Sequence, residues 1–490
     1  MRFGMLVAVL SRINLFIGAA MVVPTACALA YGENSWVPLA QAAALTIGIC
    51  GLLSLIFRMP KEELTHREGM TIVTLGWLTA SFFGSLPYIF GDLLGPISFD
   101  NAVNCIFESV SGFTTTGASV LGTAVPIESV ERGLLLWRSM TQWMGGMGII
   151  VLAIAIMPLL GVGGMQLFRS EAPGPTKEKL RPRIRETAAT LWMVYLTFTA
   201  LEAFLLMLGG MDLFDAICHS FTTMSTGGFS TRDASIGAFG SAYVDCIIMF
   251  FMLLSGANFA LHYYALTGKI KNYWHSTEFK AFLLIVSCAA LATSAFLMAN
   301  AAYPGPLETL RRGAFQAVSI MTTTGFATAD FEAWPYAPQI LLLLLMFIGG
   351  CAGSTSGSLK IARVVLLARY AYREIFRLVH PHSFAAVKFD RMVVHKDVLE
   401  SVCGFFILFI SAFVIGSLAM AGMGVDILTS VSSVASALGN IGPGLGTVGP
   451  AENYHHLPAA SKMLLSALMI LGRLEIYTVL IILMPEFWKK

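Results

Sequence analysis

Charged side chains are scarce in this sequence. Asp, Glu, Lys and Arg make up 12% of the 490 residues, whereas apolar residues make up 56%. A soluble domain carries about a quarter charged residues, so the composition excludes an ordinary soluble protein and indicates a polytopic membrane protein.

The motifs of several other protein classes are also missing. The eight cysteines are scattered through apolar segments without a C-x-x-C pair, which favours small core residues over redox or metal chemistry. No G-x-x-x-x-G-K-[ST] segment is present, so we expect no nucleotide bound through a P-loop. Because no His, Cys or carboxylate cluster falls at a plausible depth, we expect neither an enzyme nor a resident cofactor. We expect no cleaved signal peptide, because the first apolar run is too long for one.

Four short peptides rich in threonine, serine and glycine recur along the chain. They occupy residues 114–119, 224–229, 322–327 and 439–444. When Gly117, Gly227, Gly325 and Gly442 are aligned, the spacing is about a hundred residues each time, which is too long for a solenoid and indicates one large repeated membrane unit.

Each of these peptides follows a short apolar stretch that opens with polar or acidic residues. The stretches are 102–112, 216–223, 310–321 and 427–438. A helix needs about 20 residues to cross the hydrocarbon core, so we predict re-entrant half-helices. The C-terminus of a helix carries partial negative charge, and four such ends that converge favour a cation.

The longer apolar segments predict ten full crossings. These are about 5–31, 37–57, 70–92, 133–160, 187–209, 242–267, 281–301, 337–371, 398–422 and 462–485. The predicted fold is an all-α polytopic membrane protein in which four parallel pseudo-repeats of helix, half-helix, filter loop and helix surround a central pore. The predicted units are an N-terminal transmembrane helix pair (1–69) and the pore repeats 70–160, 161–267, 268–371 and 372–490.

Charge distribution orients this topology. Most of the 31 basic residues fall in the loops and ends on one side, and Lys and Arg remain on the cytoplasmic side of short loops. We therefore expect both termini in the cytoplasm and all four glycine-containing peptides near the outer face. Repeats in one orientation are related by an axis along the membrane normal.

The four peptides have the composition of a cation filter. A dehydrated cation needs a ring of oxygen ligands, which backbone carbonyls supply. Glycine tolerates the backbone geometry that this requires, and hydroxyl groups add ligands or hold the loop. A single T-x-G is more often an ordinary turn, but four copies behind four half-helices favour the filter.

These peptides and half-helices resemble those of the Trk/Ktr/HKT superfamily, in which one membrane subunit contains four fused potassium-channel-like units. The resemblance covers about residues 70–485, and the additional helix pair at the front resembles the Trk branch. It implies potassium as the transported ion, the only metal expected, bound at the filter. The implied filter residues are Thr115, Thr116, Gly117, Ser225, Thr226, Gly227, Thr323, Thr324, Gly325, Asn440, Ile441 and Gly442. The fourth peptide departs most, because Asn440 and Ile441 replace hydroxyl residues.

Small and hydroxyl residues interrupt the predicted crossing 337–371. Such a run cannot hold a stiff helix, and broken backbone at membrane depth is tolerated only around a cavity; close helix packing is the alternative. The resemblance implies a gating loop, whose candidate residues are Gly349, Gly350, Gly353, Ser354, Thr355, Ser356 and Gly357.

Arg473 lies inside the last predicted crossing. An arginine at that depth is costly and should face a pore or a partner. The resemblance implies a barrier to cations beneath the filter; a structural ion pair is the alternative, for which Glu475 is poorly placed because i and i+2 residues do not share a helix face.

Four other polar residues lie at membrane depth: Arg138, Glu202, Asp245 and Asn258. They predict either helix-packing contacts or part of a proton path.

The resemblance also implies partners. It predicts a homodimer in the bacterial inner membrane that docks on cytosolic, nucleotide-binding regulatory subunits; the basic loops alone predict contact with anionic lipid. No nucleic-acid partner is expected. The competing hypotheses are a secondary carrier for another solute and a sodium-permeable cation transporter.

Overall fold

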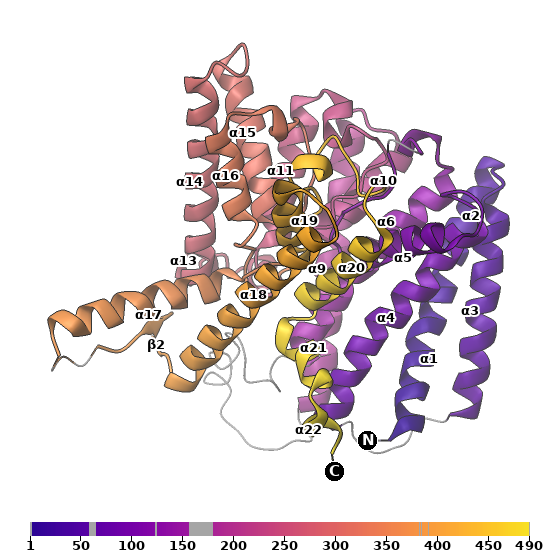
Figure 1. Cartoon of the computed structure of the whole chain (residues 1–490), viewed down its shortest axis with the longest axis horizontal. Coiled ribbons are helices and arrows are strands. Elements are labelled where there is room, and N and C mark those ends of the chain that lie inside the picture. The colour runs from indigo at the N-terminus through magenta and orange to yellow at the C-terminus, as the bar shows by residue number, and fades with distance from the viewer. Residues whose placement is uncertain are drawn as a thin grey trace.

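The chain is almost entirely helical in its computed structural model (Figure 1). The structure describes residues 2–57, 65–122, 125–155, 180–381, 383, 385–390 and 392–489. Within these ranges, the strands are β1 (Lys388–Phe389) and β2 (Met392–Val393), which form a small antiparallel hairpin. The predicted all-α membrane fold is confirmed.

Three helices form the N-terminal extension: α1 (Phe3–Ala20), α2 (Val22–Tyr31) and α3 (Trp36–Ile56). Together α1 and α2 make one apolar span, interrupted at Met21 just before Pro24, whose ring removes a backbone hydrogen bond. The extension packs on the first repeat, where α1 contacts α4 and α2 contacts α6.

The first two repeats follow in the predicted order. Repeat one contains α4 (His66–Phe90), α5 (Phe99–Phe113) and α6 (Arg132–Ala155). Repeat two contains α9 (Leu180–Leu208), α10 (Leu213–Met224), α11 (Ala242–Gly256) and α12 (Phe259–Leu266). Residues 156–160 of the predicted inner helix and most of the basic segment 161–187 lie outside the described residues.

The other two repeats are built in the same way. Repeat three contains α14 (Thr277–Ala299), α15 (Pro306–Met321), α16 (Tyr336–Leu345) and α17 (Ile361–Val379), and repeat four contains α18 (Lys396–Gly422), α19 (Ile427–Gly439), α20 (Ala459–Arg473) and α21 (Ile476–Leu483). The short elements are η1 (Ile127–Ser129), η3 (Ser235–Phe239), α13 (Asn272–His275), η4 (Phe331–Ala333), η5 (Gly446–Val448) and α22 (Pro485–Trp488). The predicted unit boundaries after residues 69 and 371 fall inside α4 and α17.

The half-helices α5, α10, α15 and α19 are 15, 12, 16 and 13 residues long. Three begin with a side-chain cap, because Ser98, Asp212 and Asp426 each accept a hydrogen bond from the backbone N–H three residues later. The other, α15, has Pro306 at its first position, where the missing N–H costs nothing. These signals explain why short apolar stretches begin helices at these points.

The long helices cross the bundle, but several are broken. Among the residues that the structure describes, six helices are long and apolar enough to span a membrane alone, and two bent pairs raise the number to eight if each pair is one span. The pairs are α11 with α12, bent by 104°, and α20 with α21, bent by 115°. The predicted crossings 242–267 and 462–485 are therefore each bent at a short break, which the sequence did not predict.

The predicted interruption of 337–371 is present. Residues 346–360, here called the central loop, separate α16 from α17. By contrast, α6 continues unbroken to Ala155, where the described part of that segment ends.

The arrangement of the ends is clear in Figure 1. Helices α1 and α3 form one flank, α17 projects from the opposite flank, and both termini lie at the same end of the bundle. This agrees with termini on one side of the membrane.

Candidate cation site at the four tips

Each half-helix ends in the same tight turn, and we call residues 114–117, 225–228, 322–325 and 439–442 the four tips. In each turn, a backbone N–H donates to the carbonyl oxygen five residues earlier: Thr116 to Ser111, Gly227 to Thr222, Thr324 to Ser319 and Ile441 to Ser436. The residue just before each donor has positive φ: Thr115 (53°), Thr226 (54°), Thr323 (58°) and Asn440 (54°). Positive φ is costly for threonine, and such strain concentrates at functional sites.

The repeated turns correct the alignment of the glycines. The residue just after each donor is a glycine with positive φ: Gly117, Gly228, Gly325 and Gly442. The equivalent of Gly117 is therefore Gly228, and Gly227 matches Thr116, Thr324 and Ile441 instead. Two adjacent glycines cannot be distinguished by composition, so the sequence alignment was wrong by one residue at the second tip.

The tips contact one another in a closed ring. A Cβ atom added to Gly117 would lie 2.1 Å from the carbonyl oxygen of Gly227, and one added to Gly228 would lie 1.9 Å from that of Thr324. One on Gly325 would lie 1.9 Å from the carbonyl oxygen of Ile441, and one on Gly442 would lie 2.8 Å from that of Thr116. Each tip thus packs its glycine against an equivalent carbonyl group of the next, and the fourth closes on the first.

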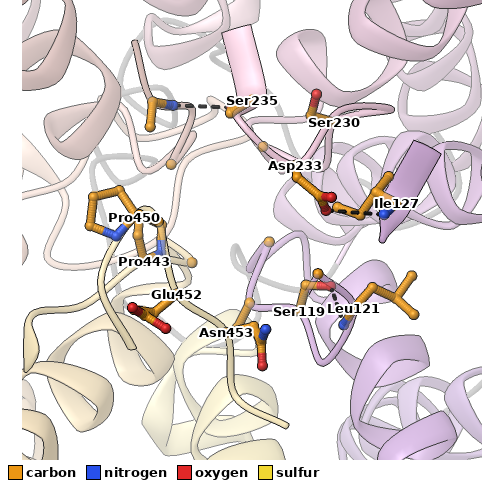
Figure 2. Close-up of a pocket in the computed structure, with 18 of the residues that line it drawn as sticks. Ser119, Leu121, Ile127, Ser230, Asp233, Ser235, Pro443, Pro450, Glu452 and Asn453 are labelled. Carbon is orange, nitrogen blue, oxygen red and sulfur yellow. Dashed lines mark hydrogen bonds between the residues drawn. The ribbon is translucent and has the colours of Figure 1, made fainter. Parts of the chain in front are cut away.

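A cavity of about 390 Å³ opens on one side of this ring. Its lining includes all four positive-φ glycines, Gly117, Gly228, Gly325 and Gly442. Figure 2 shows its wall, with Ser119 and Leu121 from repeat one, Asp233 from repeat two, and Pro443 and Glu452 from repeat four. We call it the mouth cavity.

The charges around the mouth cavity favour a cation. Arg138 and Arg232 reach the lining, but each is paired, with Glu108 at 2.6 Å and Asp215 at 2.8 Å. Asp233 and Glu452 are also in the wall. Burial raises the pKa of Asp233, and the neighbouring Glu128 carboxyl raises it further.

Glu332 adds a carboxyl group behind this wall. A Cβ atom added to Gly449, a lining residue, would lie 2.5 Å from its Oε2 atom. Burial raises the pKa of Glu332, and the nearby carboxylates Asp330, Glu452 and Asp426 raise it further. A carboxylate surrounded by other carboxylates indicates a negative potential at the mouth.

Buried side chains of α5 and α6 hold the first two tips and the residues that follow them. Glu108, fully buried, accepts hydrogen bonds from Val120 N–H and from the Ser119 hydroxyl, and its partner Arg138 donates to the Ser230 carbonyl. One turn later, Gln142 donates to the Gly227 carbonyl at 2.7 Å and accepts from Phe229 N–H at 3.1 Å. Arg138 therefore joins the first two repeats, as the packing alternative predicts, and the contacts of Gln142 had no signal in the sequence.

The central loop lies against the C-terminal ends of the half-helices, where the tips begin. Its Ser356 hydroxyl donates to the Thr322 carbonyl at 2.8 Å, and Gly357 N–H donates to the Thr323 hydroxyl at 2.7 Å. A Cβ atom added to Gly357 would lie 2.2 Å from the Gly439 carbonyl oxygen. The Thr355 hydroxyl donates to the Met224 carbonyl at 3.1 Å. The loop therefore contacts three repeats at once.

The break between α11 and α12 contacts the rest of the central loop. Cys351 N–H donates to the Gly256 carbonyl, and Phe259 N–H donates to the Gly353 carbonyl. Of the other predicted loop residues, Gly350 approaches the Gly256 carbonyl and Gly349 approaches that of Gly357. Ser354 donates to the Cys351 carbonyl.

Arg473 lies beneath the loop and is buried. Its guanidinium donates to the carbonyls of Thr355 at 2.6 Å and Gly145 at 3.3 Å. Glu475 does not neutralise it, but pairs with Arg363 of α17 at 2.5 Å. Arg473 therefore bridges the central loop and α6 through backbone oxygens.

The other polar residues at membrane depth have separate surroundings. Asn258 caps α12 by accepting from Ala260 N–H, and Asp245 lies 3.5 Å from Arg311. Neither carboxyl oxygen of Glu202 has a hydrogen-bond partner among the described residues. In those same ranges, no group of three His, Cys, Asp or Glu side chains is placed to hold a metal ion.

Comparison with known proteins agrees with this geometry. The family model "TrkH: Cation transport protein" matches residues 39–490. The chain belongs to the TrkH family. The Trk system potassium uptake protein TrkH of Escherichia coli (strain K12) is 42% identical over the full length of both chains. The TrkG protein of the same strain is 37% identical, with 96% of this chain and 95% of that protein covered. The crystal structure of the potassium transporter TrkH from Vibrio parahaemolyticus matches all of both chains, with a TM-score of 0.92 and 38% identity.

Proposed function

We propose that the chain takes up potassium across the bacterial inner membrane through the ring of four tips. The observation that carries this proposal is the closed ring itself, in which four equivalent glycine–carbonyl contacts surround one axis at the base of the mouth cavity. The relatives support the ion, since TrkH and TrkG of Escherichia coli are potassium uptake proteins.

In this proposal, backbone oxygens replace the water around potassium. The predicted filter residues of all four tips contribute, with Gly228 added beside Gly227. Helices α5, α10, α15 and α19 direct their C-terminal partial negative charges at the ring, and the carboxylates at the mouth raise the local cation concentration.

Two elements would control flow below the ring. The central loop, with Gly349, Gly350, Gly353, Ser354, Thr355, Ser356 and Gly357, occupies the path as a gate. Arg473 holds the loop and places positive charge in the path of the cation. Support comes from the direct hydrogen bonds of the loop to the third tip.

Membership of a Trk system supports the partners. We propose a homodimer that docks on cytosolic nucleotide-binding regulatory subunits of the TrkA type, with both termini and α17 facing the cytoplasm. In this orientation the mouth cavity opens to the outside, where potassium enters.

The decisive experiment is ion flux in proteoliposomes. The purified chain should pass rubidium faster than sodium, and Gly325→Ser should abolish that preference, because a side chain there meets the Ile441 carbonyl. A folded wild-type chain that passes neither ion, even with a matching regulatory subunit, would favour the solute-carrier hypothesis. Unchanged discrimination in Gly325→Ser would remove the ring as the filter.

A further inference from the structure

The start of α14 lies where the central loop and α17 meet. Glu278, its second residue, is buried with 8% of its surface exposed. One oxygen of its carboxyl, Oε1, accepts hydrogen bonds from Ala352 N–H at 2.6 Å and from Ala362 N–H at 3.2 Å. Ala352 belongs to the first half of the central loop, and Ala362 is the second residue of α17. A single carboxyl oxygen therefore joins the central loop to the start of α17.

Two backbone hydrogen bonds close the central loop near its ends. We call these two bonds the neck, and the residues between them, 351–358, the lobe. Gly349 N–H donates to the Leu359 carbonyl at 2.9 Å, and Ile361 N–H donates to the Gly350 carbonyl at 3.1 Å. Glu278 binds beside these two bonds, at the point where the chain enters and leaves the lobe. Ile361 is the first residue of α17, so its bond joins the lobe to that helix, and a movement of α17 reaches the lobe at this neck.

Glu278 also completes the N-terminus of α17. The residue at the cap position is Lys360, whose ammonium group has only donors and makes no cap bond. The first N–H groups of a helix need an acceptor, and a negative charge is favoured there. Glu278 supplies both from a different helix, so α17 and the lobe depend on the same carboxylate.

A second contact at α14 comes from beyond the other end of α17. Asp390, in the turn of the β1–β2 hairpin, accepts a hydrogen bond from Thr277 N–H at 2.7 Å. The hairpin and α17 share a small apolar core with the start of α18, built from Ala362, Leu366, Val387, Phe389, Leu399 and Val402. Thr277 and Glu278 are adjacent, so this unit is fastened to α14 at two successive residues.

Much of the far part of α17 is exposed. It projects from the flank of the bundle (Figure 1), and Tyr372 and Leu378 are 70% and 83% exposed. A force on this helix reaches Glu278 through the Ala362 N–H bond, and through Glu278 it reaches the lobe.

We propose that Glu278 is the positioning residue that couples α17 and its hairpin to the central loop. Glu278 holds the lobe against the tips while α17 is in place, and displacement of α17 frees the lobe. The inference rests on the proposed function for its effect on ion flow, but the mechanical coupling can be measured without any flux.

Cys351, beside Ala352 and fully buried, reports the position of the lobe. Its reaction with a maleimide is followed by mass spectrometry of the peptide in wild type, Glu278→Ala and the isosteric Glu278→Gln. Loss of a hydrogen bond to a charged group should speed labelling in Glu278→Ala by about tenfold. Glu278→Gln should give a smaller increase, because an amide oxygen still accepts both bonds. Glu400→Gln, which removes an exposed carboxylate on α18, is the matched control and should label like wild type.

Rubidium and sodium flux of the same proteins completes the test. Glu278→Ala should raise rubidium flux without changing the rubidium-to-sodium ratio, since the tips are untouched. Asp390→Ala should increase labelling and flux in the same direction, by less. Wild-type labelling rates in both folded Glu278 variants overturn the inference, as does faster labelling with lower flux. An unchanged Asp390→Ala overturns the part assigned to the hairpin. A wild-type chain without any flux overturns the proposed function, whereas the labelling result still decides the role of Glu278.

Discussion

The side-chain amide of Asn440 donates to the Thr116 hydroxyl at 3.0 Å and to the Met469 carbonyl at 2.9 Å. The fourth tip is thereby tied to the first and to α20. Asn440 occupies the position that threonine takes in the other three tips, and asparagine tolerates its positive φ better than threonine does. The tip that departs most in sequence therefore closes the ring.

Replacing Asn440 should loosen that closure. Asn440→Ala loses both bonds, so we expect the rubidium-to-sodium flux ratio to fall by about tenfold, the effect of about 1.4 kcal/mol. Asn300→Ala, at the exposed end of α14, is the control. Wild-type selectivity in Asn440→Ala would show that the Thr116 contact has no part in discrimination.

The two adjacent glycines of the second tip should respond differently. A Cβ atom at Gly228 would meet a backbone carbonyl at positive φ, whereas Gly227 does not have positive φ and a Cβ atom there would meet the end of the Gln142 side chain. Gly228→Ala should thus reduce selectivity about 5- to 30-fold more than Gly227→Ala, given about 1–2 kcal/mol for the left-handed conformation alone. The same rubidium and sodium fluxes measure this. If Gly227→Ala is the more harmful change, the structural alignment of the tips is wrong.

Removing the charge of Arg473 should speed ion flow. Arg473→Ala loses the bond to Thr355 and a positive charge whose insertion costs roughly 2.5–3.5 kcal/mol at this depth. We expect rubidium uptake to rise several-fold at normal expression, measured in a potassium-uptake-deficient strain. Arg377→Ala, exposed on α17, is the control. Lower uptake by well-folded Arg473→Ala would assign the residue a purely structural role.

The ion pair of Glu108 and Arg138 should be needed for folding. Arg138→Met leaves a fully buried carboxylate without its cation, a change that costs about 3–5 kcal/mol. The apparent Tm in detergent should fall sharply, and the double variant Glu108→Gln with Arg138→Met should recover much of the loss. An equally low Tm in the double variant would show that the other bonds of Arg138, such as that to the Ser230 carbonyl, dominate.

Glu332 should make stability depend on pH. Its pKa is raised in the folded protein, so folding disfavours the ionised form, and stability decreases as pH rises from the unfolded pKa through the folded one. Glu332→Gln should therefore stabilise the chain at pH 7, by no more than about 1 kcal/mol because the group is partly exposed. Thermal unfolding at pH 7 and pH 4 checks this, with the gain expected to vanish at pH 4. A gain that is the same at both values would point to a cause other than charge.

Local signals in the sequence were sufficient to predict the half-helices and the interrupted helix. Ser98, Asp212 and Asp426 cap helices that are too short to cross a membrane, and the glycine and serine run of the central loop cannot remain helical. The same reasoning missed the break between α11 and α12. There Gly256 and Phe259 bond to the central loop, almost a hundred residues away, and no local propensity records such a contact.

The candidate site likewise combines features that the sequence predicted with features that only the folded chain shows. Glycine and threonine identified the four tips, but the register of Gly227 and Gly228 needed the hydrogen bonds of the folded turn. Gln142 and Glu278 were missed because a single polar residue on an apolar helix gains its meaning from the backbone groups that it meets in the fold. Glu475 follows the same rule, since its partner is Arg363 rather than the neighbouring Arg473.

The central loop comes from one repeat only, while α6 in the first repeat stays unbroken as far as it is described. Four identical subunits around a pore can open by moving outward together, each by the same amount. In the gate proposed for this chain, the obstruction belongs to a single repeat. Displacement of the central loop alone would then open the passage, while the ring of four tips keeps its shape.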